Sequence, residues 1–260
     1  MICMRPARFC ILLCIAIATS VPFGYAEQPK KKHKPVKDVP ALMCERGELL
    51  FSDDFSGEKL SEEWKPALGQ WEIVDGALKG TELAKDNHPA VMRHPMEFKN
   101  LVAQFCLMFD GGKATSFSCN KTGVGHVCRV SITPTGFSVY KDKPNKESTE
   151  EGKVLDTAKF EFKKGDWYTV LVEILDEEMV ATVTAPDGKH TMTAFGEHPK
   201  VAEDKKSDFA LPVSGEAIYF DDIRVWEAQP NKKWKTTKKK LEYIRKVLQA
   251  REAARQLQQK

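Results

Sequence analysis

The sequence predicts an all-β fold for residues 41–230, namely a jelly-roll sandwich of two antiparallel sheets. Short apolar runs with alternating faces recur along this region, and Gly, Pro and Asp turns separate them. That pattern is typical of sandwiches rather than of helical bundles. The hydrophobic content of 42% is also high enough for a real core, and a region of this length suits one large sandwich.

The clearest expected element is a hairpin within residues 165–188. Its first run, Trp167–Leu175, alternates with period two, and the even-numbered residues form a wholly apolar face. We expect that face to be buried, because each such side chain removed from water contributes roughly 1.5–3 kcal/mol. A short acidic turn, 176–178, precedes the second run, Met179–Thr184. An isolated hairpin is marginal in water, so this one must pack on a second sheet.

Further strands are expected on both sides of this hairpin, for a total of roughly 12. They are Leu49–Phe51, Gln70–Val74, Ala77–Lys79, Ala90–Arg93, Asn100–Asp110, Ala114–Cys119, Gly125–Ile132, Gly136–Lys141, Ser207–Leu211 and Ala217–Trp226. Asp75-Gly76 is a strong signal for a two-residue turn between the second and third of them. Trp64 and Trp71 are expected in the core, and residues 141–153 form a charged loop.

The N-terminal residues 1–26 have the pattern of a secretory signal peptide. Arg5 and Arg8 precede an apolar run, and Gly24-Tyr25-Ala26 places small residues at a cleavage point. The alternative is a membrane anchor, but the run of about 13 residues is shorter than the roughly 20 needed to span a bilayer. We therefore expect a secreted, periplasmic or cell-envelope protein with no transmembrane segment after processing.

The net charge of +3 is distributed unevenly along the chain. Residues 1–40 hold 7 Lys/Arg and 2 Asp/Glu, residues 231–260 hold 11 and 2, and the region between them therefore carries −11. Residues 27–40, rich in Lys and Pro, are expected to be a disordered basic linker. Residues 231–260 are expected to form a basic amphipathic helix of about 20 residues. It is either a solvated tail or a contact for an anionic surface, and nucleic acid is not an expected partner of an exported chain.

Four cysteines remain after the expected leader, namely Cys44, Cys106, Cys119 and Cys128. Cys119 and Cys128 flank a Gly-containing connection between two strand-like runs, so they are the best candidates for a disulfide. The alternative is that both are free and act as small core residues. The spacings match no zinc signature.

Three stretches of the sequence resemble a known superfamily. They are Asp53-Asp54-Phe55 followed by Trp64 and Gly69–Leu78, then Gly165-Asp166-Trp167, and finally Ile218–Trp226. The chain resembles the concanavalin A-like lectin/glucanase superfamily over residues 48–228. Within it, the chain is most similar to the 3-keto-disaccharide hydrolase-like group, known as domain of unknown function 1080. The resemblance implies a jelly-roll fold and a carbohydrate ligand, but its motifs are structural.

A sugar site needs planar hydrogen-bonding side chains on one face of a sheet. The polar candidates are His88, Arg93, Asn120, His126, Arg129, Tyr140 and Asp142. Strand alternation places His126 and Cys128 on one face and Arg129 on the other, which argues against a single cluster of Asn120, His126 and Arg129. The alternative for each residue is a solvated or ion-paired position on the surface.

The resemblance also suggests two further kinds of site. Relatives carry Ca²⁺ near the first and last strands, so Asp54 and Asp221 are the candidate ligands of a structural calcium ion. Retaining glucanases of the superfamily carry E-x-D-x-x-E on one strand, whereas residues 173–178 read E-x-x-D-E-E. Glu173 and Asp176 then point to opposite faces, which favours a polar turn over a catalytic pair.

Three functions follow from these observations. The first is a secreted, lectin-like module that binds carbohydrate or another cell-envelope ligand, without catalysis. The second is a hydrolase of 3-keto-disaccharides or related glycosides, which rests on family similarity alone. The third is a structural or assembly protein of the cell envelope, whose basic ends contact acidic partners.

Overall fold

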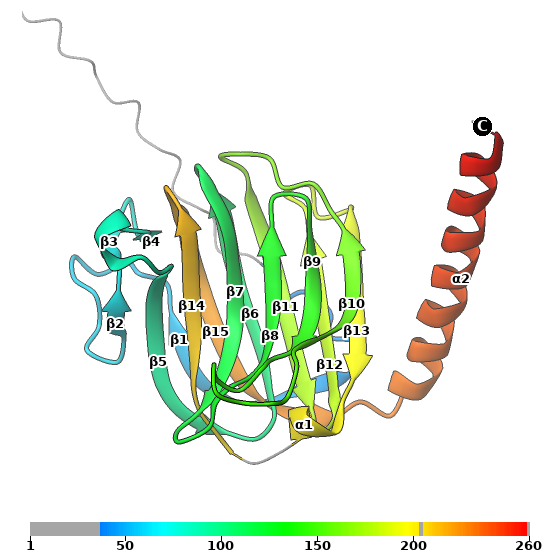
Figure 1. Ribbon diagram of the computed structural model, residues 1–260, viewed down its shortest axis with the longest axis horizontal. Coiled ribbons are helices and arrows are strands. Elements are labelled where there is room, and N and C mark those ends of the chain that lie inside the picture. The colour runs from blue at the N-terminus through cyan, green and yellow to red at the C-terminus, as the bar shows by residue number, and fades with distance from the viewer. Residues whose placement is uncertain (1–36, 203–204, 259–260) are drawn as a thin grey trace, which may run out of the picture. The chain divides into compact units, whose positions relative to one another are not determined.

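The computed structural model describes residues 37–202 and 205–258 of the chain. Within these ranges the predicted all-β architecture is confirmed, because 15 strands form two antiparallel sheets that pack face to face (Figure 1). The predicted signal peptide, residues 1–26, lies outside the described residues, as do residues 27–36 of the predicted linker.

One sheet has eight strands. They are β1 (Cys44–Asp53), β3 (Gln70–Val74), β4 (Ala77–Thr81), β6 (Leu101–Phe109), β11 (Trp167–Leu175), β12 (Glu178–Thr184), β13 (Thr191–Glu197) and β15 (Ile218–Pro230). Their order is β13-β12-β11-β6-β15-β4-β3, and β1 pairs with the second half of β15. The chain's expected first and last strands are therefore neighbours.

The other sheet has seven strands. They are β2 (Lys65–Leu68), β5 (Ala90–Phe98), β7 (Gly112–Lys121), β8 (Gly125–Thr133), β9 (Gly136–Lys141), β10 (Lys153–Lys159) and β14 (Lys206–Gly215), in the order β10-β9-β8-β7-β14-β5-β2. Three helical segments complete the described chain. They are a 3-10 turn (Ala84–Asp86), α1 (Pro199–Ala202) and α2 (Trp234–Gln258).

Every predicted strand coincides with an observed one, and Asp75-Gly76 forms the expected turn with positive φ at both residues (54° and 74°). Three observed strands, β2, β10 and β13, were not expected. All three lie at the edge of a sheet. An edge strand is paired on one side and covered incompletely, so its sequence lacks the buried alternation that marks a central strand.

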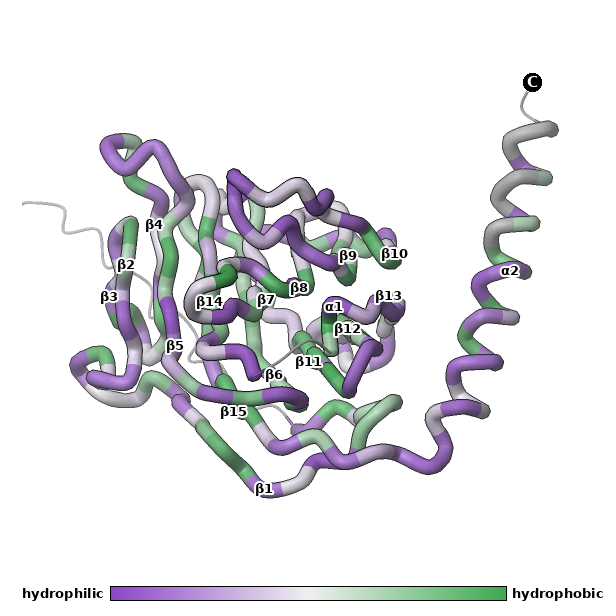
Figure 2. Tube along the Cα trace, turned by 60° about the horizontal axis from the view of Figure 1, so that its bottom comes forward, coloured by the Kyte–Doolittle hydropathy of each residue, from purple (hydrophilic) through white to green (hydrophobic). Residues whose placement is uncertain are grey.

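The core lies between the two sheets, and aromatic side chains dominate it. Phe105, Phe117, Phe137, Phe209 and Phe220 are at most 1% exposed. The even-numbered face of β11 points into this core, as its sequence predicts. Trp64 is buried in the same core and Trp71 is partly buried against it. Hydrophobic stretches follow the strands, whereas much of α2 is hydrophilic (Figure 2).

A second, smaller cluster covers the outer face of the eight-stranded sheet; we call it the outer cluster. Its buried members are Met43, Cys44, Val102, Leu171, Val180, Phe195, Trp226 and Trp234. Val39, Ala41 and Leu42 pack against it. The segment that leads into β1 and the start of α2 therefore close this face of the sandwich.

Glu173 holds the N-terminal segment onto this face. Its side chain leaves β11 on the outer side and is fully buried. The carboxylate accepts backbone N–H groups from Leu42 (3.0 Å), Met43 (2.8 Å) and Cys44 (2.7 Å). Burial raises the pKa of Glu173, and the three N–H groups oppose that shift. The carboxylate thus satisfies backbone donors that would otherwise be buried without a partner.

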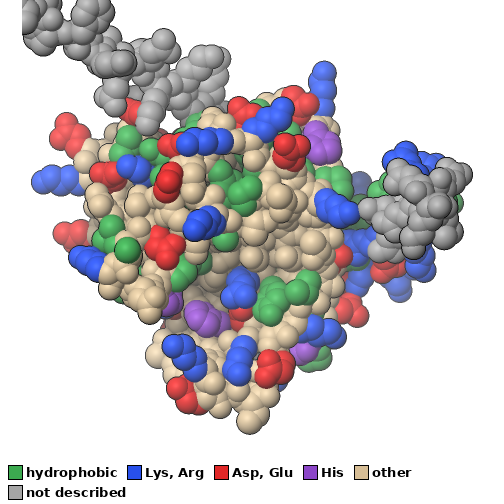
Figure 3. Space-filling model, turned by 45° about the horizontal axis from the view of Figure 1, so that its top comes forward, with side chains coloured by type: hydrophobic (Ala, Val, Ile, Leu, Met, Phe, Trp, Pro, Cys, Tyr) green, Lys and Arg blue, Asp and Glu red, His purple; other side chains and the backbone are tan. Residues whose placement is uncertain are grey.

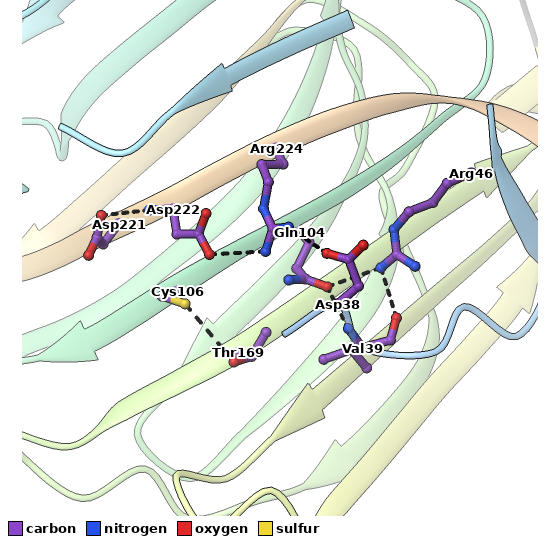
Figure 4. A network of polar contacts seen from close by, with 9 residues as sticks. All are labelled: Asp38, Val39, Arg46, Gln104, Cys106, Thr169, Asp221, Asp222 and Arg224. Atoms are coloured by element: carbon purple, nitrogen blue, oxygen red, sulfur yellow. Dashed lines mark hydrogen bonds and ion pairs between the residues drawn. The ribbon is translucent and has the colours of Figure 1, made fainter. Parts of the chain in front are cut away.

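Polar side chains extend this attachment along the same face (Figure 4). The Gln104 Oε1 atom accepts the Val39 N–H (2.8 Å) and an Arg46 N–H (3.0 Å), and Arg46 also donates to the Val39 carbonyl (2.8 Å). Arg224 forms an ion pair with Asp38. Residues 38–46 are therefore bound to the sheet by directed contacts as well as by apolar packing.

Helix α2 begins as part of the outer cluster. Trp234 is 8% exposed, packs edge-on against Phe195 at 6.0 Å and donates to the Glu178 Oε2 atom (3.0 Å). One turn later, Lys238 pairs with Glu178 (2.6 Å) and Glu197 (2.7 Å). The helix of the predicted basic tail has 25 residues, which is longer than expected, and its first turns belong to the sandwich.

The later turns of α2 are more open. Arg245 still reaches Asp156 and lies over the Phe195 ring at 4.3 Å. Tyr243, Ile244 and Leu248, in contrast, are 69%, 52% and 51% exposed. Among residues 37–202 and 205–258, no helix combines the length and apolar character needed to cross a membrane.

Candidate functional site

A cleft of about 470 Å³ lies on the outer face of the seven-stranded sheet, over β7, β8 and β14. Its floor consists of small residues at the outward positions of these central strands. They are Ser116, Ser118, Ser131, Ala210, Pro212 and Ser214. Larger side chains at these positions would fill the space, so the small residues create the cleft.

Strand register sets the walls of the cleft. Arg93 of β5 pairs with Ala210 of β14, Ala210 with Ser118 of β7, and Ser118 with Arg129 of β8. Neighbouring strands lie about 4.8 Å apart, so the two arginine backbones stand roughly 14 Å from each other. Two small residues separate them. The cleft is therefore an open trough between two guanidinium-bearing strands.

A β-bulge brings the other polar residues to the same face. Cys119 pairs with Cys128, but the next residue, Asn120, pairs with His126, which leaves Val127 as the extra residue. Val127 and Cys128 both belong to the core between the sheets. His126 and Arg129 consequently share the outer face with Asn120, and all three line the cleft. The expectation from simple alternation was wrong here, because the bulge shifts the parity by one residue.

A chain of hydrogen bonds fixes the orientation of His126. The Asp208 Oδ1 atom accepts Arg93 (3.0 Å) and the Asn120 amide N–H (2.7 Å). The Asn120 Oδ1 atom then faces the His126 Nδ1 atom at 2.7 Å. Because an amide oxygen only accepts, Nδ1 carries the proton and Nε2 of the neutral ring is an acceptor. Burial and the charges of Arg129 and Arg93 lower the pKa of His126, which favours this neutral ring.

Contacts with Asp142 and Tyr140 fix the position of the Arg129 side chain. Its guanidinium pairs with the Asp142 Oδ1 atom (2.7 Å) and lies over the Tyr140 ring at 4.6 Å. The Asp142 side chain is 4% exposed, and its Oδ2 atom has no hydrogen-bond partner among the described residues. Burial raises the pKa of Asp142 to about 6, against the opposing effect of Arg129. Arg129 thus keeps one edge toward the cleft while a buried carboxylate and an aromatic ring position it.

The cleft continues into a second hollow of about 740 Å³, which shares Arg93, Asn120 and His126 with it. Residues 121–125 around the β7–β8 turn, the loop segment 143–147, and Ser207 and Asp208 form the rest of its wall. This continuation adds Lys121, Lys143 and Lys146 to the lining. Figure 3 shows Lys, Arg and His side chains gathered on one part of this side of the molecule.

Five of the seven polar candidates line the first hollow, namely His88, Arg93, Asn120, His126 and Arg129, and Asp142 does not. Tyr140 does not line it and instead supports Arg129. Sequence reasoning missed Asp208, although this residue binds Arg93 and Asn120. It also missed the floor. Small residues at the outward positions of neighbouring strands indicate a cleft floor, but this pattern can be recognised only after the order of the strands is known.

The predicted disulfide is wrong, although Cys119 and Cys128 are direct cross-strand partners. Both are free thiols, and Cys44 and Cys106 are free as well. The side chains of Cys119 and Cys128 point into the apolar core. Burial there raises the pKa of the Cys119 thiol, and the Cys128 thiol lies within hydrogen-bond reach of the Cys119 thiol. The two cysteines are therefore free, small residues of the core, which was the alternative to a disulfide.

The structure gives local roles to the two carboxylates, Asp54 and Asp221, that the resemblance suggests as calcium ligands. Oδ1 of Asp54 accepts the Ser56 N–H (3.1 Å), and Oδ1 of Asp221 accepts the Asp222 N–H (2.7 Å). Across the described ranges, no group of three or more His, Cys, Asp or Glu side chains converges to hold an ion. The two carboxylates are thus engaged in local backbone turns.

The acidic segment at 173–178 has two separate structural roles. Glu173 binds the N-terminal segment, while Asp176 lies in the turn between β11 and β12 with φ of 50°. The Asp176 N–H donates to the Asn100 Oδ1 atom (2.9 Å). The expected polar turn is present, and Glu173 differs from expectation in being a buried anchor.

Comparisons with known proteins identify the fold. The chain has the jelly-roll fold of concanavalin A-like lectins and carbohydrate-binding modules. One similar structure is the CBM2 module of the evolved Dit of Lactobacillus casei BL23 phage J-1, with a TM-score of 0.54 and 8% identity over 72% of this chain and 98% of that chain. Lectin UEA-II complexed with galactose has a TM-score of 0.52 and 9% identity over 71% of this chain and 100% of that chain. Carbohydrate-binding module CBM66 from Bacillus subtilis has a TM-score of 0.50 and 10% identity over 64% of this chain and 96% of that chain. No protein-family model and no curated protein matches the sequence.

Proposed function

We propose that the protein is a lectin-like carbohydrate-binding module that binds a glycan in the cleft over β7, β8 and β14. One observation carries this proposal: hydrogen-bonding side chains, already fixed by buried partners, surround a floor of small residues. The lectins and carbohydrate-binding modules with a similar fold support the same ligand class. Binding without turnover is the simplest activity that such an arrangement provides.

The chemistry of the cleft suits sugar hydroxyls, which both donate and accept hydrogen bonds. The Nε2 atom of His126 accepts, the guanidinium groups of Arg93 and Arg129 donate, and the serine hydroxyls of the floor do both. No Phe, Trp or Tyr is among the described residues that line the cleft. We therefore propose recognition through hydrogen bonds rather than through stacking on an aromatic platform.

A glycan array with the intact protein tests this proposal. We expect binding to a defined set of glycans, and we expect the Ser118→Tyr variant to lose it because the phenol fills the cleft. The matched control is Ser56→Tyr, since Ser56 is exposed in the loop after β1 and is not among the residues that line the cleft. Loss of binding in the control, or its retention in Ser118→Tyr, would place the ligand elsewhere.

A second candidate is hydrolysis of 3-keto-disaccharides or related glycosides. The chain of hydrogen bonds from Asp208 through Asn120 to His126 favours it, because it leaves an acceptor nitrogen directed for use as a general base. A turnover assay on 3-keto-disaccharides decides between the two functions. Product release that His126→Gln abolishes would establish the hydrolase; unchanged substrate would leave the binding module.

The two basic ends suggest where the module works. We propose that the chain is exported, and that the exposed basic turns of α2 associate with an anionic surface of the cell envelope. Lys239 and Lys240 lie beside the exposed Tyr243 and Ile244. Sedimentation at low salt with vesicles of phosphatidylglycerol, compared with phosphatidylcholine, tests this. Equal sedimentation with both lipids, or unchanged sedimentation of the double variant Lys239→Gln, Lys240→Gln, would contradict it.

A further inference from the structure

We propose that the glycan recognised by the cleft carries acidic groups, either carboxylates or sulfates. This inference rests on the proposed carbohydrate function and narrows its ligand class. The starting observation is one of charge: residues 41–230 carry a net −11, yet the lining of the cleft and its continuation is cationic.

The imbalance is clear in the lining residues themselves. Five carry a positive charge: Arg93, Lys121, Arg129, Lys143 and Lys146. Two carry a negative charge, Glu147 and Asp208. A cationic recess in an otherwise acidic domain concentrates anions at that place, because the local potential attracts them while the remaining surface repels them.

The two arginines are built to bind an anion rather than only to balance the charges beside them. Arg93 meets Asp208 through one nitrogen, and Arg129 meets Asp142 through one nitrogen. A guanidinium has five N–H donors in a planar fork, so donors remain on each. The two arginine side chains are 39% and 35% exposed, whereas their carboxylate partners are 16% and 4% exposed. Each acid therefore holds its arginine at one nitrogen, and both arginines remain partly exposed in the lining of the cleft.

The geometry of the trough matches a chain of sugars with acidic substituents. Arg93 and Arg129 stand at the two ends of one cross-strand row, separated only by Ala210 and Ser118. A ligand lying on this floor has a guanidinium on each side. His126 lies in the next row. Burial and the charges of these same arginines lower its pKa, which favours a neutral ring whose Nε2 atom accepts a sugar hydroxyl and leaves the anions to the arginines. Arginine forks pair with carboxylates and sulfate-like oxyanions in bidentate geometry.

The test compares matched trisaccharides by titration calorimetry in low salt with the intact protein. The three probes are a neutral galactose trisaccharide, a galacturonic acid trisaccharide and a sulfated galactose trisaccharide. We expect at least one acidic probe to bind about tenfold more tightly than the neutral probe. We also expect Arg93→Gln and Arg129→Gln each to weaken binding of the acidic probes more than binding of the neutral probe, and so to reduce this preference.

Two controls keep the result interpretable. Lys189→Gln removes an exposed positive charge from the β12–β13 turn of the other sheet and should leave the preference intact. Lys146→Gln removes a charge from an exposed loop of the cleft, and it provides the second variant if Arg93→Gln does not fold.

Equal affinity for all three probes would overturn the inference and leave the carbohydrate function standing. No binding to any glycan, here or on the array, would overturn the carbohydrate function itself. An acidic preference that survives in every cleft variant, or equal binding of a short single-stranded DNA, would also overturn the inference.

Discussion

The outer faces of the two sheets differ in what covers them. The eight-stranded sheet carries the outer cluster and is closed by residues 38–44 and the first turn of α2. There, the buried carboxylate of Glu173 binds the chain's own backbone. On the seven-stranded sheet, small residues leave a trough, and the carboxylates of Asp142, which is buried, and of Asp208, which is partly buried, hold arginines that line it. Polar groups are thus used for stability on one face and are kept available for a ligand on the other.

The largest expected effect lies on the closed face, at Glu173. The Glu173→Ala variant leaves three N–H groups without this acceptor, two of them buried and one partly buried, so we expect the free energy of unfolding to fall by about 3–5 kcal/mol. Urea titration followed by tryptophan fluorescence measures it. Glu177→Ala, an exposed acid in the adjacent turn, should change stability by less than about 0.5 kcal/mol. Similar values for both variants would show that the segment 38–44 is not held by this carboxylate.

The next effect concerns the attachment of α2. The Trp234→Ala variant loses the edge-on contact with Phe195 and the hydrogen bond to Glu178. We expect a loss of about 3 kcal/mol in the free energy of unfolding, at the low end for a buried tryptophan. The helix should also become sensitive to limited proteolysis. Tyr243→Ala, at a position 69% exposed, is the control, and equal proteolysis of both variants would mean that Trp234 does not attach the helix.

A pH-dependent effect is expected beneath the open face, at Asp142. Burial raises its folded pKa to about 6, above the ordinary value of 3.8. The folded state therefore holds this proton longer than the unfolded state, so the contribution of Asp142 to stability falls as pH rises from about 4 to about 6. Relative to Asp142→Asn, the wild type should lose up to about 3 kcal/mol across that interval. Parallel stability profiles of the two proteins would show that Asp142 is ionised throughout.

The smallest effect on stability is expected at the rim of the cleft. His88 is exposed and lines the cleft, and its Nδ1 atom lies 2.8 Å from the carbonyl oxygen of the neighbouring Pro89. The His88→Ala variant should therefore change the free energy of unfolding by no more than about 0.5 kcal/mol, while it weakens glycan binding. Thermal unfolding and the glycan array measure the two properties. A large loss of stability at His88 would mean that the open face is also a structural one.

Local sequence pattern predicted most of the sandwich. The central strands bury side chains on alternate positions, so their runs are visible in the sequence, as in the even-numbered face of β11. The edge strands β2, β10 and β13 escaped notice because pairing on one side leaves them without that pattern. The site was predicted in part: His88, Arg93, Asn120, His126 and Arg129 were among the polar candidates for a sugar site and do line one cleft.

The sequence by itself determined the alternation that builds two layers, the acidic domain between basic ends, and the residue types available for a ligand. Only the tertiary structure decided which of those residues meet. Val127 bulges out of register and turns His126 and Arg129 to one face, and strand order places β14 and its Asp208 between β7 and β5. It also decided that Glu173 is an anchor rather than part of a turn. These outcomes depend on pairing between segments far apart in the chain, which the local periodicity of a strand does not encode.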